Sequence, residues 1–378
     1  MNFFKRDFIV REPLLVGILV LITVAFSALT HAYSQAYDRQ RAALGVDWFE
    51  RGKRELGKNH AAVAIEDFRT ALFYNARNWD YSMHLADALA QSGQTDQALN
   101  YYQNLWQTHP SSGQINLQLA RLTAGKGDVN SAERYFNGAI FGDWPEHANE
   151  NRRIASMELI HFYLDRGDSG HAESQLIILS ENLPQNPELH TRVADLFSRV
   201  GDDRRALEQY RHAERLNPDY APAIQGAGES AFRSGDFHAA QDYLQKVVRL
   251  DDSNTSAKKM LEIIQSIFQL NPYERGISET EKIRRTLRTF AIAGQRLQSC
   301  SGTSNSPSNT SMEPQLERWK QLQIMANSRF LTQHPEEVET LLEFSINSEK
   351  LAEPKCGAPS IDDEAVMAIA RQRESQDR

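Results

Sequence analysis

Hydrophobic positions recur along the middle of the chain with a long and regular period. Six alanines stand 34, 34, 40, 34 and 34 residues apart. They are Ala64, Ala98, Ala132, Ala172, Ala206 and Ala240. A bulky apolar residue follows each alanine by four positions, and a small or aliphatic residue follows three positions later. Because these offsets lie on one face of a helix, the pattern predicts six copies of one helical unit.

Each copy also carries the signals of a turn between two helices. Glycine stands five residues before each alanine, except in the first copy, where Asn59 takes this place. Both residue types tolerate the left-handed conformation that ends a helix. A small residue stands twelve positions before each alanine, except for Ile160 in the fourth copy. Since small residues let helices pack closely, each copy is predicted to be a helix, a turn and a second helix.

Four aspartates directly follow these turn glycines. They are Asp128, Asp168, Asp202 and Asp236. An acidic side chain at this place accepts hydrogen bonds from the free N–H groups of the next helix and favours the positive end of its dipole. We therefore predict that these aspartates cap helices, and we assign them no catalytic or metal-binding role.

The repeated residues resemble the tetratricopeptide repeat, a 34-residue unit of two packed helices. The family's proline at the end of the second helix matches Pro110, Pro184 and Pro218, and its tryptophan near the start matches Trp48. The resemblance covers residues 45–254 and implies an all-α helix-turn-helix solenoid of the kind found in membrane-anchored bacterial members of the family. The expected repeats are 45–78, 79–112, 113–146, 153–186, 187–220 and 221–254.

The sequence departs from the family pattern in a few places. The first repeat lacks the proline, and the sixth has Asp252 there. Six extra residues separate the third and fourth repeats, within the stretch from Gly142 to Arg153 that contains Trp144. We expect a lengthened loop between these repeats, which would bend the superhelix.

The C-terminal part loses the period but keeps helical patterning. Residues 255–270 are expected to form a capping helix over the exposed end of the last repeat. Residues 271–378 are expected to form a small helical domain. Its predicted helices are Glu279–Leu297, Leu316–Leu331, Val338–Leu351 and Ile361–Ala370. A mobile loop is expected at 301–311, because this stretch is polar and rich in Ser, Asn and Pro.

The N-terminal part predicts one membrane-spanning helix. Residues 1–12 form a basic leader, and 13–32 form an apolar run long enough to cross a bilayer. A cleaved signal peptide is the alternative, since Thr30-His31-Ala32 is a tolerable cleavage site. We favour a retained anchor because the apolar run exceeds the usual length of a signal core.

The net charge limits the kinds of partner to be expected, and the cysteines bear on the cellular compartment. The formal net charge of −8 provides no basic field for nucleic acid, so we expect no nucleic-acid partner. The chain has two cysteines, Cys300 and Cys356, outside any short-spaced metal or redox motif. A disulfide between them would require an oxidising compartment and place the repeats on the extracytoplasmic side of a cytoplasmic membrane. Two reduced thiols in a cytosolic domain are the alternative.

Candidate chemistry is sparse. No phosphate-binding, zinc-binding or nucleophile motif occurs, so we expect no enzyme activity, no cofactor and no metal. His334 precedes two glutamates at a predicted helix start, where acidic residues favour the dipole. His161 and His171 flank one turn, and no third metal ligand is evident. Surface or packing roles are expected for all three histidines.

The resemblance instead implies binding of a protein or peptide partner along the first helices of the repeats. Carrying the family's groove positions onto this sequence gives a set of mixed charge: His84, Asp87, Gln91, Gln118, Arg121, Glu158, His161, Asp165, Arg192, Asp195, Arg199, Glu229 and Arg233. The Lys, Asn and Arg pattern with which some family members clamp acidic C-termini is not reproduced, which argues against such a receptor.

The expected function is that of a membrane-anchored scaffold or adaptor in a cell envelope, with the membrane contacted through residues 13–32. Three alternatives remain open. One is a cytosol-facing scaffold that recruits soluble enzymes to the membrane. Another is an enzymatic or regulatory module in 271–378 with the repeats as its substrate selector. The third is a self-assembling structural protein.

Overall fold

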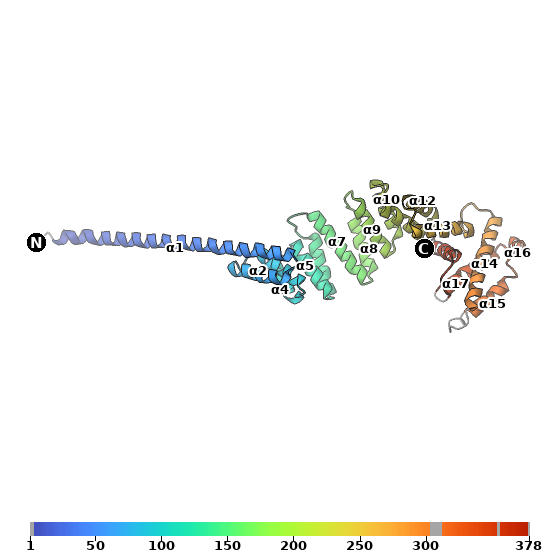
Figure 1. The fold of residues 1–378 in the computed structure, drawn as a ribbon, viewed down its shortest axis with the longest axis horizontal. Helices are drawn as coiled ribbons and strands as arrows, with labels where there is room; N and C mark the ends of the chain where they lie inside the picture. Colours follow the sequence, from blue (N-terminus) through green and yellow to red (C-terminus); the bar gives the residue numbers. More distant parts are fainter. Residues whose placement is uncertain (1–3, 303–311, 354–355, 377–378) are drawn as a thin grey trace. The chain divides into compact units, whose positions relative to one another are not determined.

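The computed structural model describes residues 4–302, 312–353 and 356–376, and Figure 1 shows it as a ribbon. The described residues contain eighteen α-helices, no strand, and one isolated β-bridge between Ser112 and Asp143. The chain forms two compact units, Met1–Asp165 and Arg166–Arg378. The expected fourth repeat, 153–186, spans the boundary between these units.

The first unit contains α1 to α7. Their bounds are α1 Phe4–Gly57, α2 Ala61–Tyr74, α3 Trp79–Gln91, α4 Thr95–Thr108, α5 Gly113–Gly125, α6 Val129–Phe141 and α7 Ala148–Asp165. The C-terminal part of α1 packs against α2, and the pairs α3 with α4 and α5 with α6 follow. Close packing depends on the predicted small residue: a Cβ atom on Gly52 would lie 2.6 Å from the ring of Phe68.

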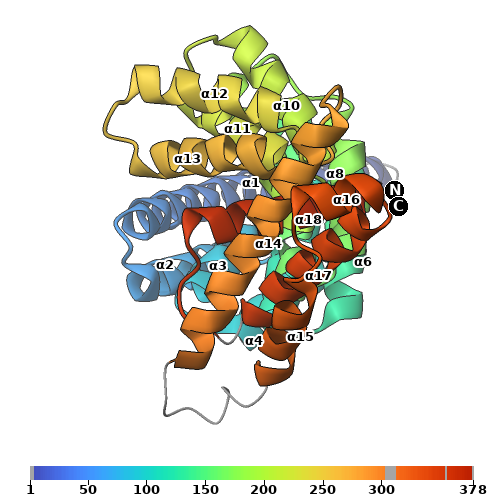
Figure 2. The ribbon, with the colours of Figure 1, turned by 90° about the vertical axis from the view of Figure 1, so that its right-hand side faces the viewer.

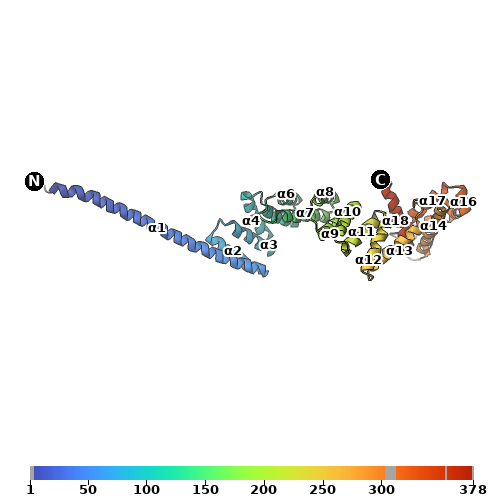
Figure 3. The same cartoon turned by 90° about the horizontal axis from the view of Figure 1, so that it is seen from above.

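The apolar N-terminal segment and the first repeat share one helix. Figure 3 shows α1 continuing without a break beyond the part that packs on α2. Residues 4–12 of the expected leader, the expected membrane span 13–32 and the start of the first expected repeat, 45–78, are therefore successive parts of α1. The connecting residues 33–44 contain no glycine or proline, so nothing in their sequence ends the helix.

The insertion between the third and fourth repeats forms both a loop and a helix extension. Residues 142–147 are non-helical, so the expected loop lies within the stretch from Gly142 to Arg153, and 148–153 form the start of α7. Ala148 and Glu150 suit the first turn of a helix. His147 has a φ of 48° and its carbonyl accepts from the N–H of Asn151 at 2.9 Å. The left-handed residue therefore reverses the chain into α7.

The second unit contains α8 to α18. Their bounds are α8 Ser169–Ser180, α9 Pro187–Val200, α10 Asp203–Leu216, α11 Ala221–Arg233, α12 Phe237–Leu250, α13 Thr255–Leu270, α14 Glu279–Gly302, α15 Glu313–Leu322, α16 Ser328–Gln333, α17 Glu337–Ala352 and α18 Ile361–Gln376. Helices α9 and α10 form one packed pair, and α11 and α12 form the next.

The predicted aspartate caps are present in both units. Asp128 and Asp168 accept hydrogen bonds from the N–H groups of Ser131 and His171, both at 3.2 Å. Asp202 and Asp236 do the same for residues three positions on, at 3.0 and 3.1 Å. This prediction is confirmed, because each aspartate is the N-cap of a second repeat helix.

The C-terminal helices form their own core around α14. Trp319 packs with Phe290, and its indole N–H donates to the Phe290 carbonyl at 3.1 Å. The predicted continuous helix Leu316–Leu331 is wrong. It breaks into α15 and α16 because the side chain of Asn327 caps a new helix by accepting from the N–H of Phe330 at 2.8 Å.

The other predicted C-terminal helices exist with shifted ends. Helix α14 continues past Leu297 to Gly302, and α18 continues past Ala370 to Gln376. The mobile loop expected at 301–311 therefore starts within α14, and the remainder of that loop, 303–311, lies outside the described residues.

The predicted capping helix is itself covered. Helix α13 contacts α12, and it also contacts α18 from the end of the chain. Figure 2 shows α18 beside α14 and α17. The side-chain amide of Gln372 on α18 donates to the carbonyl of Gly235, the turn glycine of the last repeat, at 2.8 Å. Both α13 and α18 therefore contact the last repeat, α13 through α12 and α18 through the turn at Gly235.

Candidate functional site

A cleft in the first unit combines predicted groove residues with the insertion. It has a volume of about 520 Å³. Its walls are formed by Trp79, Gln114, Leu117, Gln118, Arg121, Trp144, Pro145, Glu146, His147, Asn151 and Ile154. Two of these, Gln118 and Arg121, belong to the expected groove. We call this site the tryptophan cleft.

The indole of Trp144 is held firmly in the wall of the tryptophan cleft. Its N–H donates to the carbonyl of Ala139 at 2.9 Å. The ring lies so close to the start of α5 that a Cβ atom on Gly113 would approach its Nε1 to 2.2 Å. The N–H of Gly113 also donates to the carbonyl of Asp143 at 2.9 Å, which ties the insertion to α5. The insertion therefore supplies a rigid aromatic wall.

The second tryptophan lies at the start of α3. The ring of Trp79 is 6.0 Å from that of His109, and its buried Nε1 has no hydrogen-bond partner among the described residues. An unpaired buried donor costs free energy unless a partner group satisfies it. Trp79 thus gives the tryptophan cleft a second aromatic wall residue, and its indole N–H is buried within the fold.

The two charged groove residues of this region neutralise each other. Arg121 donates from two nitrogens to the two carboxylate oxygens of Glu158, at 2.8 and 2.6 Å. These bonds raise the pKa of Arg121. Because the pair is bidentate and only part-exposed, the two charges are not independently available to a partner.

Two of the expected groove aspartates are used within the fold. The hydroxyl of Tyr102 donates to Asp87, and that of Tyr210 donates to Asp195 at 2.5 Å, each across fifteen residues. Burial raises the pKa of Asp87, while the bond from Tyr102 opposes that rise. Both aspartates therefore orient a buried tyrosine of the second repeat helix.

The remaining groove residues of the first unit divide into two groups. His84 packs its ring 4.9 Å from that of Phe49, and Gln91 donates to the side chain of Asn59 at 3.0 Å. His161 and Asp165 are exposed on α7. The first pair supports packing, and the second pair is accessible.

A second cleft lies within the second unit and has a volume of about 390 Å³. Its walls are formed by Asp195, Tyr210, Ala221, Pro222, Gln225, Gly226, Glu229, Val247, Asp251 and Asn254. Gln225 donates to Glu229 at 2.9 Å and accepts from Asn254 at 3.2 Å. This chain of polar side chains lines the cleft with groups that can bond to a peptide backbone.

The arginines expected beside this second cleft differ in their surroundings. Arg233 donates to Asp203 at 2.8 Å and to the hydroxyls of Ser198 and Ser230. Arg192 and Arg199 are exposed on α9. Arg233 is exposed as well, but its charge is paired with that of Asp203.

Sequence reasoning missed part of the tryptophan cleft. Trp79, Gln114 and Pro145 were not among the expected groove residues, although they line it. Trp144 could be singled out because it lies in the insertion. Trp79 begins the second repeat, but it is not at one of the positions that recur in every copy. The pairing of Arg121 with Glu158 crosses 37 residues, and the insertion shifts it out of the repeat period.

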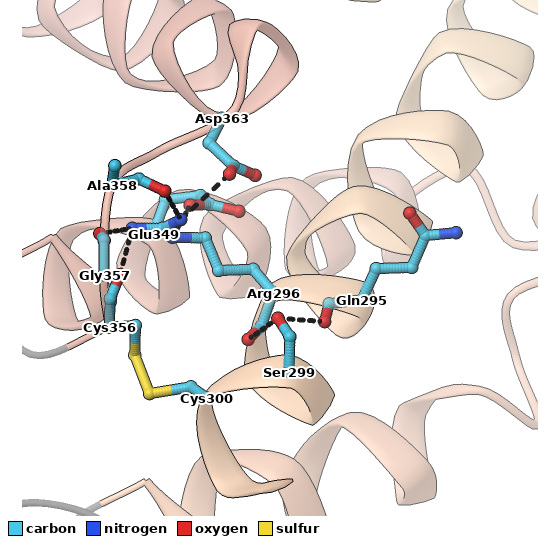
Figure 4. The surroundings of a disulfide bond; sticks show 9 residues. All are labelled: Gln295, Arg296, Ser299, Cys300, Glu349, Cys356, Gly357, Ala358 and Asp363. Atoms are coloured by element: carbon cyan, nitrogen blue, oxygen red, sulfur yellow. Dashed lines mark hydrogen bonds and ion pairs between the residues drawn. A yellow bond between two sulfur atoms is a disulfide. The ribbon is translucent and has the colours of Figure 1, made fainter. Parts of the chain in front are cut away.

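The two cysteines are joined by a disulfide, which links the end of α14 to the segment after α17 (Figure 4). Within the described ranges, no group of three or more His, Cys, Asp or Glu side chains could hold a metal ion.

Comparisons with known proteins agree with the repeat pattern. Two sequence models described as Tetratricopeptide repeat match residues 49–112 and 89–141. The chain is 24% identical over 215 residues to the human Protein O-mannosyl-transferase TMTC1, over 55% of this chain and 23% of that protein. It is 23% identical over 219 residues to the Tetratricopeptide repeat and J domain-containing co-chaperone DNJ1 of Fusarium oxysporum, over 56% of this chain and 41% of that protein.

The matched regions span less than half of the length of these curated relatives. Among solved structures, the C-terminal part of a TPR repeat-containing protein from Cytophaga hutchinsonii matches with a TM-score of 0.46 and 11% identity, over 70% of this chain and 99% of that chain. The two sequence-model matches extend from the packed end of α1 to α6, so they include part of the tryptophan cleft.

Proposed function

Because the chain is a tetratricopeptide repeat protein, we propose that it is a non-enzymatic scaffold that binds segments of partner proteins and holds them at a membrane. The observation that carries this proposal is the tryptophan cleft, in which the insertion between the third and fourth repeats places a fixed indole beside first-helix residues.

The composition of the tryptophan cleft suits a peptide segment with an apolar or aromatic anchor. Trp79, Trp144 and Pro145 provide broad apolar faces, and buried aromatic contacts dominate the free energy of many protein interfaces. Gln114 and Gln118 provide amides that can pair with a peptide backbone. Since Arg121 and Glu158 already pair with each other, charge contributes less to this recognition than apolar burial.

Anchoring is supported by α1. The part from Val16 to Gly57 contains a window with a mean hydropathy of 1.9, none of which is buried in the structure. A helix of this length and composition can cross a bilayer, and a signal sequence would have the same properties. We favour a retained anchor, because the same helix also packs on α2 and would join the first repeat to the membrane without a flexible tether.

An extracytoplasmic location of the repeats is supported by the disulfide between Cys300 and Cys356. Disulfides persist in oxidising compartments and are rare in the cytosol. We therefore place the scaffold in a cell envelope, with α1 in the cytoplasmic membrane and the repeats outside it.

The cleft is tested by photo-crosslinking in the native host. A photoreactive p-benzoyl-phenylalanine at Gln118 is expected to capture a partner. The same group at Gln103, which is exposed on the second-helix side at α4, is the matched control and is expected to capture none. Equal capture at both positions would contradict a binding role for the tryptophan cleft.

The location is tested by the intact mass of the protein isolated from membranes after alkylation of free thiols. Full length with neither cysteine labelled is the expected result. Labelling of both cysteines would indicate that the repeats lie in the cytosol. A loss of about the first 32 residues would show that the N-terminal segment is a cleaved signal peptide.

A further inference from the structure

A pocket in the second unit lies apart from both clefts. Its volume is about 200 Å³, and its walls come from α11, α14, α17, α18 and the segment before α18. Phe232, Pro359 and Met367 supply apolar surface. The remaining wall residues are charged, and among them Arg296, Glu349 and Asp363 are buried. Charged side chains are seldom buried without a partner.

One charged wall residue, Arg296, is bound by the fold at both of its terminal nitrogens. Its Nη2 donates to the carbonyls of Cys356 at 2.8 Å and Gly357 at 3.2 Å, and its Nη1 lies 3.0 Å from a carboxylate oxygen of Asp363 (Figure 4). Together with the disulfide, these bonds hold the segment after Cys356 against α14. The terminal nitrogens of Arg296 are therefore not available to an anionic ligand.

Another charged wall residue, Glu349, is buried and incompletely paired. Its side chain is 1% exposed, and one of its oxygens lies 3.4 Å from Nε of Arg296. The other oxygen, Oε1, has no hydrogen-bond partner among the described residues. Burial, and next the negative charge of Asp363, raise the pKa of Glu349 to about 7. A buried acceptor of this kind costs free energy until a donor reaches it.

The other charges around the pocket favour a cationic donor. Glu353 follows Glu349 by four residues and so lies on the same face of α17, at an exposed position. On α18, Asp363 is bound by Arg296, and Glu364 pairs with Lys259 at 2.8 Å. Among the described wall residues, the four carboxylates of Glu349, Glu353, Asp363 and Glu364 outnumber the two cations, Arg296 and Arg371.

We propose that this pocket binds a small organic ammonium compound. Its charged nitrogen donates to Glu349, and its apolar part packs on Phe232 and Met367. The volume is sufficient, because an enclosed cavity of about 150 Å³ accommodates benzene. This proposal does not depend on partner binding by the repeats, since the pocket shares no residue with either cleft.

The first test is calorimetric titration of the full-length chain in detergent with benzylammonium chloride, and with benzyl alcohol as its neutral isostere. The ammonium compound is expected to bind at least about tenfold more tightly, because its contact with a carboxylate is charge-assisted. Its affinity is expected to rise between pH 6 and pH 8, since the carboxylate form of Glu349 is the acceptor and the pKa of this group is about 7.

Three variants identify the site. Glu349→Gln is expected to weaken benzylammonium binding by at least about tenfold and to remove its pH dependence. Met367→Trp fills the pocket while leaving every carboxylate in place, so it is expected to abolish binding and covers the case in which Glu349→Gln fails to fold. Glu343→Gln, at an exposed position of α17 outside the pocket, is expected to bind as the native chain does.

Any of three results would overturn the proposal. Equal affinity for benzylammonium and benzyl alcohol would show an apolar cavity without recognition of charge. Unchanged binding by both Glu349→Gln and Met367→Trp would place the binding site outside this pocket, and no binding by the native chain would show that the pocket holds no ammonium compound.

Discussion

In the repeats, the same stabilising contacts occur in several copies, whereas the C-terminal helices depend on contacts that occur once. An aspartate caps the second helix in four repeats, and a tyrosine hydroxyl donates to an aspartate fifteen positions earlier in two of them. In the C-terminal helices, each contact occurs once: one disulfide, and one buried arginine that bonds to a carboxylate and to several carbonyls. Stability is therefore distributed in the first region and concentrated in the second.

The largest expected effect is that of Arg296→Met. This change leaves the buried carboxylate of Asp363 without its cation, and breaking a buried pair in this way costs about 3–5 kcal/mol. The free energy of unfolding in denaturant measures the loss. Arg288→Met, at an exposed position of the same helix, is the control and is expected to change it by about 0.5 kcal/mol or less. Equal free energies of unfolding for the two variants would show that the stability of the C-terminal region does not depend on Arg296.

The double change Cys300→Ser with Cys356→Ser comes next. The bond closes a loop across 56 residues, and its removal is expected to lower the free energy of unfolding by about 2–4 kcal/mol. A thiol-free phosphine reductant should lower the stability of the native chain by a similar amount and leave the double variant unchanged. A native chain that unfolds identically with and without reductant would contradict a stabilising disulfide.

The same contrast explains what the sequence could predict. The repeats were predictable because a contact that recurs every 34 residues leaves a period, and the capping aspartates fall at fixed places in it. The break at Asn327 was missed because Ile324 and Met325 continue the apolar pattern across it. No repeating signal in the sequence predicts the contact of α18 with the last repeat either, since it rests on a single bond from Gln372 to the carbonyl of Gly235.

The site was predictable only in part for a related reason. Gln118 and Arg121 could be carried over from the repeat register, and both line the tryptophan cleft. Register alone does not reveal pairing between repeats, so the bond from Arg121 to Glu158 was not foreseen. The network of Arg296, Glu349 and Asp363 joins three helices through single residues, and nothing in the sequence distinguishes them from surface charges.

A substitution in the tryptophan cleft tests whether the repeats, too, contain a single contact on which much of their stability depends. Gly113→Ala brings a methyl group against the indole of Trp144 and is expected to cost about 1–3 kcal/mol by overpacking. Displacement of this wall should also reduce partner capture at Gln118. Gly125→Ala is the control on the same helix, because its Cβ atom would meet nothing within 4 Å. Equal partner capture by the two variants would show that the insertion has no role in partner binding.

The smallest expected effects are those of the four cap substitutions, Asp128→Ala, Asp168→Ala, Asp202→Ala and Asp236→Ala. Each removes one bond to a helix N-terminus and is expected to lower the free energy of unfolding by about 1 kcal/mol. Asp242→Ala, an exposed aspartate within α12, removes the same charge without a cap and is expected to cost less. The costs should be similar across repeats, since each cap serves only its own helix and neighbours. If one cap cost several times more than the others, stability in the repeats would be concentrated as well, and the difference between the two regions would disappear.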